Sequence, residues 1–360
     1  HGRIDAQTYT VKSLTGSAPA LTAATDTDWL LFRAYTSLFD AESGTVNTGT
    51  TLFTDLHSGE AVDLVTGNYQ WNIACYADAV DTKDEETGYG GWDTDAAHYL
   101  KIYTPTDPSE VGVSQRHQGL PGTGYRLSPL TSTPDAWFNI LSTGNDYMRI
   151  EGIAVDGSNL SNAEHIRGIG VWSSDTRGDI RISSNLVYNI TNSTIDDSDR
   201  SNVSGIVIST GYAVSVYNNI ILNITCVSEH SSSDATGISS DPDAAGNVYS
   251  IYNNTVYDIK QSAATGDFAR GIYGTGTIAT CAKNNIVKDV HSRGGSEFCF
   301  YEGGSGFSAN SSHNASDDST APGSDAVDSS NIVFVNQEAG DLHLAASDTS
   351  ARDAGADLSS

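Results

Sequence analysis

Four short segments of the same pattern recur at a nearly constant interval between residues 184 and 290. They are anchored by Asn185, Asn219, Asn254 and Asn285, which lie 34, 35 and 31 residues apart. A degenerate earlier copy covers residues 151–157, and a Gly-Ile pair recurs in phase at 168–169, 205–206, 237–238 and 271–272. Self-similarity at a fixed period is the signature of stacked structural repeats.

The positions that follow each anchor differ in chemistry. The second and fifth positions are mostly aliphatic and predict inward columns, the third is mixed and suits an outer face, and the fourth is always Asp or Asn, which stabilises bends. The inward columns are Ala154, Val187, Ile221, Val256, Val287 and Gly157, Ile190, Ile224, Ile259, Val290; the outer column is Val155, Tyr188, Leu222, Tyr257, Lys288; the bend column is Asp156, Asn189, Asn223, Asp258, Asp289.

Each unit therefore contains a strand, a bend and a further strand. Two or three strands in about 30 residues are too few for a propeller blade and exclude a helix pair. They suit one coil of a parallel β-helix, in which each coil contacts only its neighbours. The anchoring asparagines would then stack about 4.8 Å apart.

The repeat resembles the right-handed parallel β-helix, or pectate-lyase-like, superfamily, and is most similar to its uncharacterised secreted bacterial members. Two further segments carry the resemblance. Residues 334–355, with Gly340-Asp341-Leu342-His343-Leu344, are similar to a closing segment of such proteins, although Arg352 stands where an aliphatic residue is usual. Residues 116–124, with Arg116-His117-Gln118-Gly119, are similar to a segment that precedes the first full coils. The resemblance covers about residues 95–357 and implies an all-β right-handed solenoid.

The expected organisation has three parts. Residues 1–95 form an N-terminal cap and irregular β region, residues 96–345 the parallel β-helix, and residues 346–360 a C-terminal tail. The apolar spacing from Asp28 to Leu38 predicts a short helix, which we expect to cap the first coil because an open coil exposes core and strand edges. The opening His1-Gly2-Arg3 is typical of a mature or trimmed start.

Charge and cysteine usage limit the partners. With 45 acidic and 18 basic residues the formal net charge is −27, which disfavours nucleic acid and anionic membranes as partners. No run approaches 18 apolar residues, so we expect no membrane insertion. The four cysteines contain no Cys-x-x-Cys pair, which argues against zinc. A disulfide between Cys281 and Cys299 and buried free thiols both remain open.

One cluster of basic residues is a candidate catalytic site. The resemblance implies that a Lys or Arg could abstract a proton beside a uronate carboxylate, as polysaccharide lyases of this fold do. Lys288, His291 and Arg293 are close in sequence, with Lys283 on the same coil. A second cluster contains Arg167, Arg177 and Arg181. The alternative interpretation of both clusters is surface charge that balances an acidic protein.

Aspartates in the loops are candidate ligands for calcium, which prefers several hard oxygens. Asp196, Asp197 and Asp199 share one loop, and Asp241 and Asp243 follow a Gly-Ile strand. None of these loops matches an EF-hand, and solvated loops are the alternative.

Asp258 and Asp289 form a separate candidate, because they occupy the same bend position in consecutive copies. At a strand spacing of about 4.8 Å two carboxylates repel each other. Either an ion-pair network with Lys260 and Lys288 or a bound cation would resolve this repulsion.

Two classes of function compete. The first is a secreted structural protein that self-associates into a filament-like extracellular or surface assembly, with contacts from residues 1–15 and 345–360. The alternative is a carbohydrate-active enzyme, most plainly a polysaccharide lyase acting on an acidic polysaccharide, or a glycan-binding adhesin. The outward columns show no dense basic-aromatic strip and no hydrolase motif, which favours the first class and an extracellular location.

Overall fold

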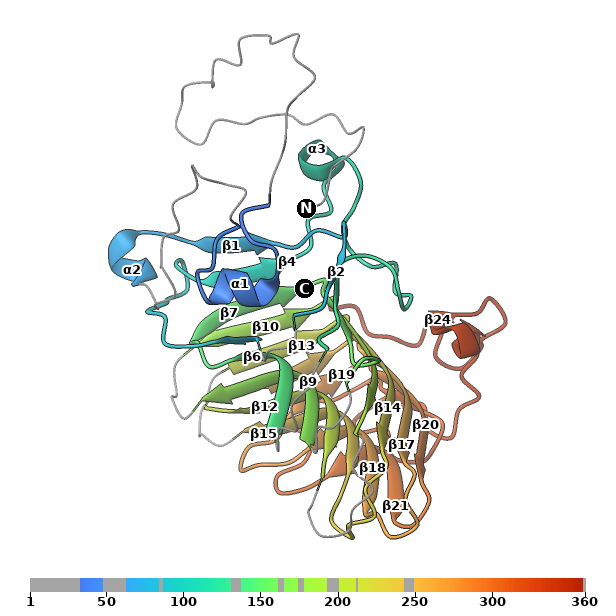
Figure 1. The fold of residues 1–360 in the computed structure, drawn as a ribbon. Coiled ribbons are helices and arrows are strands. Elements are labelled where there is room, and N and C mark those ends of the chain that lie inside the picture. The colour runs from blue at the N-terminus through green and yellow to red at the C-terminus, as the bar shows by residue number, and fades with distance from the viewer. Residues whose placement is uncertain are drawn as a thin grey trace, which may run out of the picture.

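The computed structural model is a parallel β-solenoid of about seven turns (Figure 1). It describes residues 33–47, 63–83, 87–130, 137–160, 165–173, 178–192, 201–211, 213–242 and 249–358. Each of the seven turns contributes one strand to each of three parallel sheets, so strands three apart in sequence order are neighbours; β22 adds an eighth strand to the second sheet beside β20. The described helices are few and short, so the all-β class and the solenoid that the repeat predicts are confirmed.

The three sheets run the length of the stack. The first sheet contains β1 (Trp71–Ala74), β4 (Leu100–Tyr103), β7 (Tyr147–Glu151), β10 (Asp179–Ser183), β13 (Ala213–Tyr217), β16 (Tyr249–Tyr252) and β19 (Cys281–Lys283). The second contains β2 (Val80–Asp81), β5 (Arg126–Leu127), β8 (Ala154–Asp156), β11 (Leu186–Thr191), β14 (Ile220–Cys226), β17 (Thr255–Gln261), β20 (Ile286–Ser292) and β22 (Ala315–Ser316). The third contains β3 (Thr87–Tyr89), β6 (Trp137–Thr143), β9 (His165–Ser173), β12 (Val203–Thr210), β15 (Ala235–Pro242), β18 (Phe268–Gly274) and β21 (Ser296–Glu302).

Inward columns of the repeat form the core of the solenoid. Val187, Ile221, Val256 and Val287 are in register on β11, β14, β17 and β20 and are fully buried. The degenerate copy at 151–157 is shifted by one residue from the expected alignment, because Val155 rather than Ala154 pairs with Val187. Val155 therefore points inward, and Ala154 belongs to a second apolar cluster outside the sheet.

The anchoring asparagines form a continuous ladder inside the corner between the first and second sheets. The side-chain Nδ2 of each asparagine donates to Oδ1 of the next over 2.9–3.0 Å, from Asn185 through Asn219, Asn254 and Asn285 to Asn314. The same Oδ1 atoms accept a backbone N–H of the preceding rung. The predicted stack is confirmed, and the structure adds Asn314 as a fifth rung.

The bend column adopts the left-handed backbone conformation that its residue types tolerate best. Asn189, Asn223, Asp258 and Asp289 have φ between 55° and 60°, and each lies inside a strand of the second sheet. The recurring glycines have a different role, since a Cβ on Gly237 would lie 2.6 Å from the carbonyl oxygen of Gly271 on the next strand. Glycine at this position allows neighbouring coils to approach each other.

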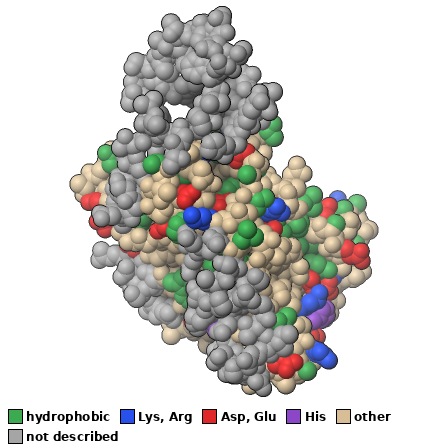
Figure 2. Space-filling view, viewed as in Figure 1, with side chains coloured by type: hydrophobic (Ala, Val, Ile, Leu, Met, Phe, Trp, Pro, Cys, Tyr) green, Lys and Arg blue, Asp and Glu red, His purple; other side chains and the backbone are tan. Residues whose placement is uncertain are grey.

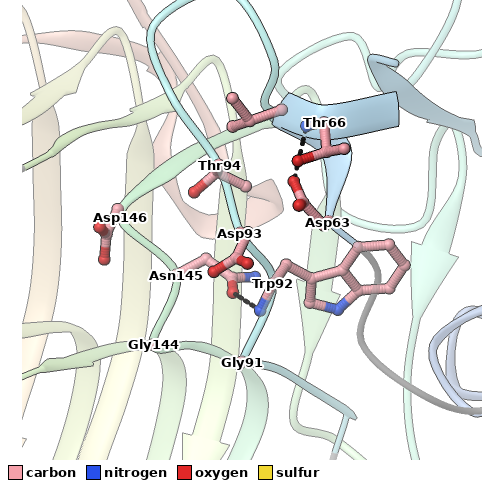
Figure 3. Close-up of a pocket in the computed structure, with 10 residues that line it drawn as sticks. Asp63, Thr66, Gly91, Trp92, Asp93, Thr94, Gly144, Asn145 and Asp146 are labelled. Atoms are coloured by element: carbon pink, nitrogen blue, oxygen red, sulfur yellow. Dashed lines mark hydrogen bonds between the residues drawn. The ribbon is translucent and has the colours of Figure 1, made fainter. Parts of the chain in front are cut away.

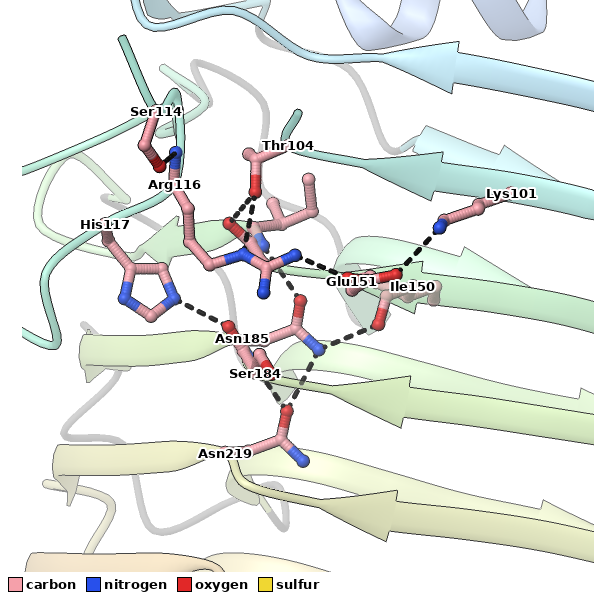
Figure 4. A network of polar contacts seen from close by, with 12 residues as sticks. Lys101, Thr104, Ser114, Arg116, His117, Ile150, Glu151, Ser184, Asn185 and Asn219 are labelled. Atoms are coloured by element: carbon pink, nitrogen blue, oxygen red, sulfur yellow. Dashed lines mark hydrogen bonds and ion pairs between the residues drawn. The ribbon is translucent and has the colours of Figure 1, made fainter. Parts of the chain in front are cut away.

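The segment 116–124 crosses the corner that the ladder lines. The guanidinium of Arg116 donates to Glu151 over 2.5 Å and to the Thr104 hydroxyl over 3.3 Å (Figure 4). His117 shares a 2.8 Å hydrogen bond between Nε2 and the carbonyl oxygen of Ser184 and accepts the N–H of Gly119 at Nδ1. Burial lowers the pKa of His117 to about 4, so Nε2–H of the neutral ring is the donor to Ser184.

A C-terminal arm covers the outer face of the second sheet. It contains β23 (Phe334–Asn336), the 3₁₀ turn η1 (Gln337–Ala339) and β24 (Asp341–Leu344), which lie beside β14, β17 and β20 in Figure 1. Phe334 packs edge-to-face on Tyr257 at 5.8 Å. The carboxylate of Asp348 accepts four backbone N–H groups, among them that of Val333 at 2.7 Å. The tail continues to Ala356, whose backbone makes two hydrogen bonds with the Asn284 side chain.

The helix that the spacing from Asp28 to Leu38 predicts is not confirmed. Residues 28–32 lie outside the described part, residues 33–37 are not helical, and α1 (Leu38–Glu42) only begins where the predicted helix ends. The backbone N–H of Leu38 donates to Asp81 over 2.7 Å and its carbonyl oxygen accepts the Tyr89 hydroxyl. The other described helices are α2 (Leu64–Gly67) and α3 (Pro108–Val111).

The first turn of the stack begins at Trp71, within the segment 1–95, because β1, β2 and β3 already pair with later strands of the three sheets. The four cysteines are buried free thiols: Cys75, Cys226, Cys281 and Cys299. Of the two alternatives that the sequence left open, the structure therefore shows free thiols and no disulfide between Cys281 and Cys299. Among the described residues no helix is long and apolar enough to span a membrane.

Candidate functional site

An arginine surrounded by aromatic rings lies on the outer face of the third sheet, at the C-terminal end of the stack. Phe268, Arg270 and Tyr273 on β18 flank the inward residues Ala269 and Ile272, which belong to the core, and lie on the outer face of the sheet. The guanidinium carbon of Arg270 lies 3.9 Å from the ring centre of Phe268, 4.6 Å from that of Tyr273 and 4.9 Å from that of Tyr301. We call Phe268, Arg270, Tyr273, Phe298 and Tyr301 the aromatic platform.

The rings of the platform also contact each other. Tyr301 on β21 lies 4.8 Å from Phe298, 5.2 Å from Phe268 and 5.4 Å from Tyr273 between ring centres. The interplanar angles of these pairs lie between 39° and 46°. All four rings are partly exposed. The platform thus presents several aromatic faces and edges to solvent within one small area.

The carboxylate of Asp234 binds Arg270, the residue at the centre of the platform. Arg270 is only 6% exposed and its Nη1 donates to Asp234 over 2.9 Å. The other oxygen of Asp234 accepts the backbone N–H of Phe268 over 3.1 Å. A buried guanidinium is costly unless it is paired, and here the pair also fixes the start of β18. Arg270 therefore serves as a support for the rings and is not exposed for contact with a charged ligand.

The same face continues toward the N-terminal end with small polar side chains. Ser239 is in register with Tyr273, and Ser209 with Asp241. At the far end Trp172 pairs with Ser209, and the guanidinium of Arg167 lies 4.3 Å from the ring centre of Trp172. Three strand spacings, or about 14 Å, separate this pair from the platform.

The three residues of the proposed catalytic cluster make separate contacts in the structure. Lys288 Nζ donates to the carbonyl oxygen of Ile332 and to Gln337 Oε1, both over 3.0 Å, so it ties the C-terminal arm to the second sheet. His291 is exposed and lies 3.8 Å from Glu297. Arg293 is exposed in the loop after β20. Lys288 thus holds the C-terminal arm, whereas His291 and Arg293 are exposed on the surface.

The second basic cluster is also divided. Arg181 is bound to Asp179 over 2.8 Å on the first sheet, whereas Arg167 stacks on Trp172 on the third. Arg177 lies outside the described residues. On the face of the molecule that Figure 2 shows, acidic and basic side chains lie scattered among uncharged ones.

Most of the candidate calcium ligands lie outside the described residues: Asp196, Asp197, Asp199 and Asp243. Asp241 is on the outer face of the third sheet. Within the described part of the chain, no group of three or more His, Cys, Asp or Glu side chains could hold a metal ion.

Asp258 and Asp289 lie at equivalent bends of neighbouring strands. Asp258 forms a 2.5 Å ion pair with Lys260, which is half of the predicted network. Lys288 does not join it, since its ammonium group is bound to the arm. Burial, and to a smaller extent the nearby carboxylate of Asp289, raise the pKa of Tyr257 well above its ordinary value.

The platform was missed by the sequence analysis, which found no dense basic-aromatic strip. The sequence feature that could have indicated the platform is the set of large residues around one Gly-Ile pair. Phe268, Arg270 and Tyr273 flank Gly271-Ile272 at outward positions. Only the pairing of β18 with β21 adds Phe298 and Tyr301 to this group.

Comparison of the chain with protein-family models, with curated proteins and with solved structures found no match in any of the three.

Proposed function

We propose that this protein is an extracellular β-solenoid of the right-handed pectate-lyase-like type that binds a neutral polysaccharide through the aromatic platform. The observation that carries the proposal is the set of four partly exposed rings held around Arg270. Binding sites combine aromatic surface with a few placed polar groups. Sugar rings have apolar faces that stack on aromatic rings and hydroxyl groups that need hydrogen-bond partners.

The charge of the protein favours a neutral ligand. A net charge of −27 repels acidic polysaccharides. Arg270, the basic residue at the centre of the platform, is buried and bound to Asp234, so it offers little to a uronate carboxylate. Ser209, Ser239 and Asp241, on the same face, would supply acceptors and donors for sugar hydroxyls.

Binding takes precedence over the two other functions that the sequence suggests. Lys288, the central residue of the proposed lyase cluster, is bound to the C-terminal arm. The tail, from which we expected contacts between copies, also binds its own solenoid through two hydrogen bonds between Ala356 and the Asn284 side chain. A self-associating assembly is still compatible with a glycan-binding surface, because the platform lies on the outer face of the third sheet.

The test is affinity electrophoresis in gels that contain a neutral β-glucan, a neutral mannan or polygalacturonate. We expect at least one neutral polymer to retard the protein and polygalacturonate to leave its mobility unchanged. Tyr301→Ala should weaken binding about tenfold, since an aromatic contact is worth roughly 0.5–1.5 kcal/mol beyond its buried area. Tyr69→Ala is the matched control, because Tyr69 is a 49% exposed tyrosine far along the chain.

Three results would contradict the proposal. One is retardation by polygalacturonate alone. Another is equal affinity of the Tyr301→Ala and Tyr69→Ala variants for the neutral polymer. The third is the absence of retardation by every polymer under conditions in which circular dichroism shows the native β signal.

A further inference from the structure

A pocket of about 550 Å³ lies at the opposite end of the third sheet from the platform (Figure 3). Three segments line it: the start of α2 at Asp63–Thr66, the stretch Gly91–Thr94 after β3, and the turn Gly144–Asp146 between β6 and β7. These segments are far apart in sequence and come together because β3 and β6 are neighbouring strands.

Backbone contacts hold the pocket in shape. Asn145 accepts the backbone N–H of Trp92 at Oδ1 over 3.0 Å. The carbonyl oxygen of Asp93 accepts the N–H of Leu64 over 3.0 Å, and Asp63 caps α2 through the N–H of Thr66. Trp92 is buried against Trp71, with ring centres 4.7 Å apart. The walls are therefore formed before any ligand arrives.

Two polar atoms in these walls lack partners. Asn145 is only 2% exposed, and its Nδ2 has no hydrogen-bond partner within the part of the chain that the structure describes. Its side chain extends across the wall toward Asp93 and Trp92 (Figure 3). The hydroxyl of Thr94 is likewise buried without a described partner. Leaving such a group unsatisfied costs about 1–3 kcal/mol, and both groups belong to the same pocket.

The donors and charges of the pocket define the chemistry of its ligand. Asp63, Asp93 and Asp146 contribute carboxylates, and none of the described lining residues is Lys or Arg, so an anionic ligand would be repelled. The amide Nδ2 of Asn145 needs an acceptor, which an ammonium ion cannot supply. A hydroxyl group can donate to a carboxylate and accept from the amide at the same time.

We propose that this pocket binds a single neutral sugar residue, with its hydroxyls between Asp93, Thr94 and Asn145. The site is separate from the aromatic platform, and the proposal does not depend on the function proposed for the platform. The volume suits one sugar residue, since pockets for small molecules begin at about 300 Å³.

The experiment is titration of the full chain with glucose, galactose, mannose and glucuronate, followed by ¹⁵N–¹H spectra of the indole groups. The signal of Trp92 is assigned by its absence in Trp92→Phe. We expect at least one neutral sugar to shift this signal and glucuronate to bind at least tenfold more weakly. Asp93→Ala should weaken the neutral sugar about tenfold, and Thr94→Val, which keeps the shape and removes the hydroxyl, severalfold.

The controls separate this site from the platform and from general charge. Asp353→Ala removes a 90% exposed carboxylate on the C-terminal tail and should leave the titration unchanged. Tyr301→Ala should also leave it unchanged, so failure of this proposal and failure of the platform are distinguishable. The proposal is overturned if no neutral sugar shifts the Trp92 signal, if glucuronate binds as well as glucose, or if Asp93→Ala and Thr94→Val bind like the wild type.

Discussion

Replacement of Asn254 by alanine would remove a central rung of the asparagine ladder. Its Nδ2 donates to the carbonyl oxygen of Val216 over 2.9 Å and to Asn285 Oδ1 over 3.0 Å. Its Oδ1 accepts both the backbone N–H and the Nδ2 of Asn219, each over 3.0 Å. Asn254 is 1% exposed, so solvent does not replace these partners without a change in the structure.

The expected loss of stability follows from these four hydrogen bonds. A net contribution of about 1 kcal/mol for each bond gives about 4 kcal/mol. Water that enters the space left by the amide would recover part of this loss, whereas unsatisfied groups on Val216 and Asn219 would add to it. We therefore expect the free energy of unfolding to fall by about 3–5 kcal/mol, which is a large fraction of the 5–15 kcal/mol typical of a folded domain.

The assay is urea unfolding followed by far-ultraviolet circular dichroism, with Asn253→Gly as the control. Asn253 precedes the rung, is exposed and has a φ of 54°, which glycine adopts without strain. The control should stay within about 0.5–1 kcal/mol of the wild type. A loss below about 1 kcal/mol in Asn254→Ala, or an equal loss in both variants, would mean that the ladder contributes little net stability.

Three other predictions test the core, the 116–124 segment and the bend. Val256→Asp would place an unpaired carboxylate at a fully buried position, and we expect the Tm to fall sharply or the protein not to fold; an unchanged Tm would contradict the inward assignment. His117 has a folded pKa of about 4 and an ordinary value of 6.5, so the unfolded state binds the proton first and the free energy of unfolding should decrease by up to about 3 kcal/mol between pH 6.5 and 4. Urea unfolding at several pH values should show this decrease in the wild type and a smaller one in His117→Asn. For the bend, the Tm of the wild type and of the double variant Asp258→Asn/Asp289→Asn is measured with calcium and with chelator. If Lys260 alone balances the charge, neither protein should change its Tm between calcium and chelator. A chelator-sensitive wild type beside an insensitive variant would establish a bound cation.

The interior of the solenoid was predictable because repetition constrains it. An inward side chain contacts the same position of the coils above and below, so Val187, Ile221 and Val256 have to be alike. The prediction was wrong by one residue at 151–157, because that copy has no asparagine to mark the corner and Ile153 takes its place beside Asn185. Asn314 was missed for the converse reason, since its neighbours Ser312-His313 and Ala315-Ser316 do not share the aliphatic pattern of the repeat.

Packing of the coils constrains the outward side chains less than the inward ones. Departures from the repeat on the outer face are therefore the places to look for a functional surface. One outward column of the third sheet reads Arg167, Ser204, Thr236, Arg270 and Phe298 from β9 to β21. Packing of the coils does not require the change from Ser and Thr to Arg and Phe, because the inward residues Ile206, Ile238 and Ile272 remain the same across it. The change does bring a buried charge that needs Asp234 as a partner. The first column loses its small side chains where a second column gains Tyr273 and Tyr301. This coincidence supports the proposed binding surface, and the Tyr301→Ala variant tests that surface directly.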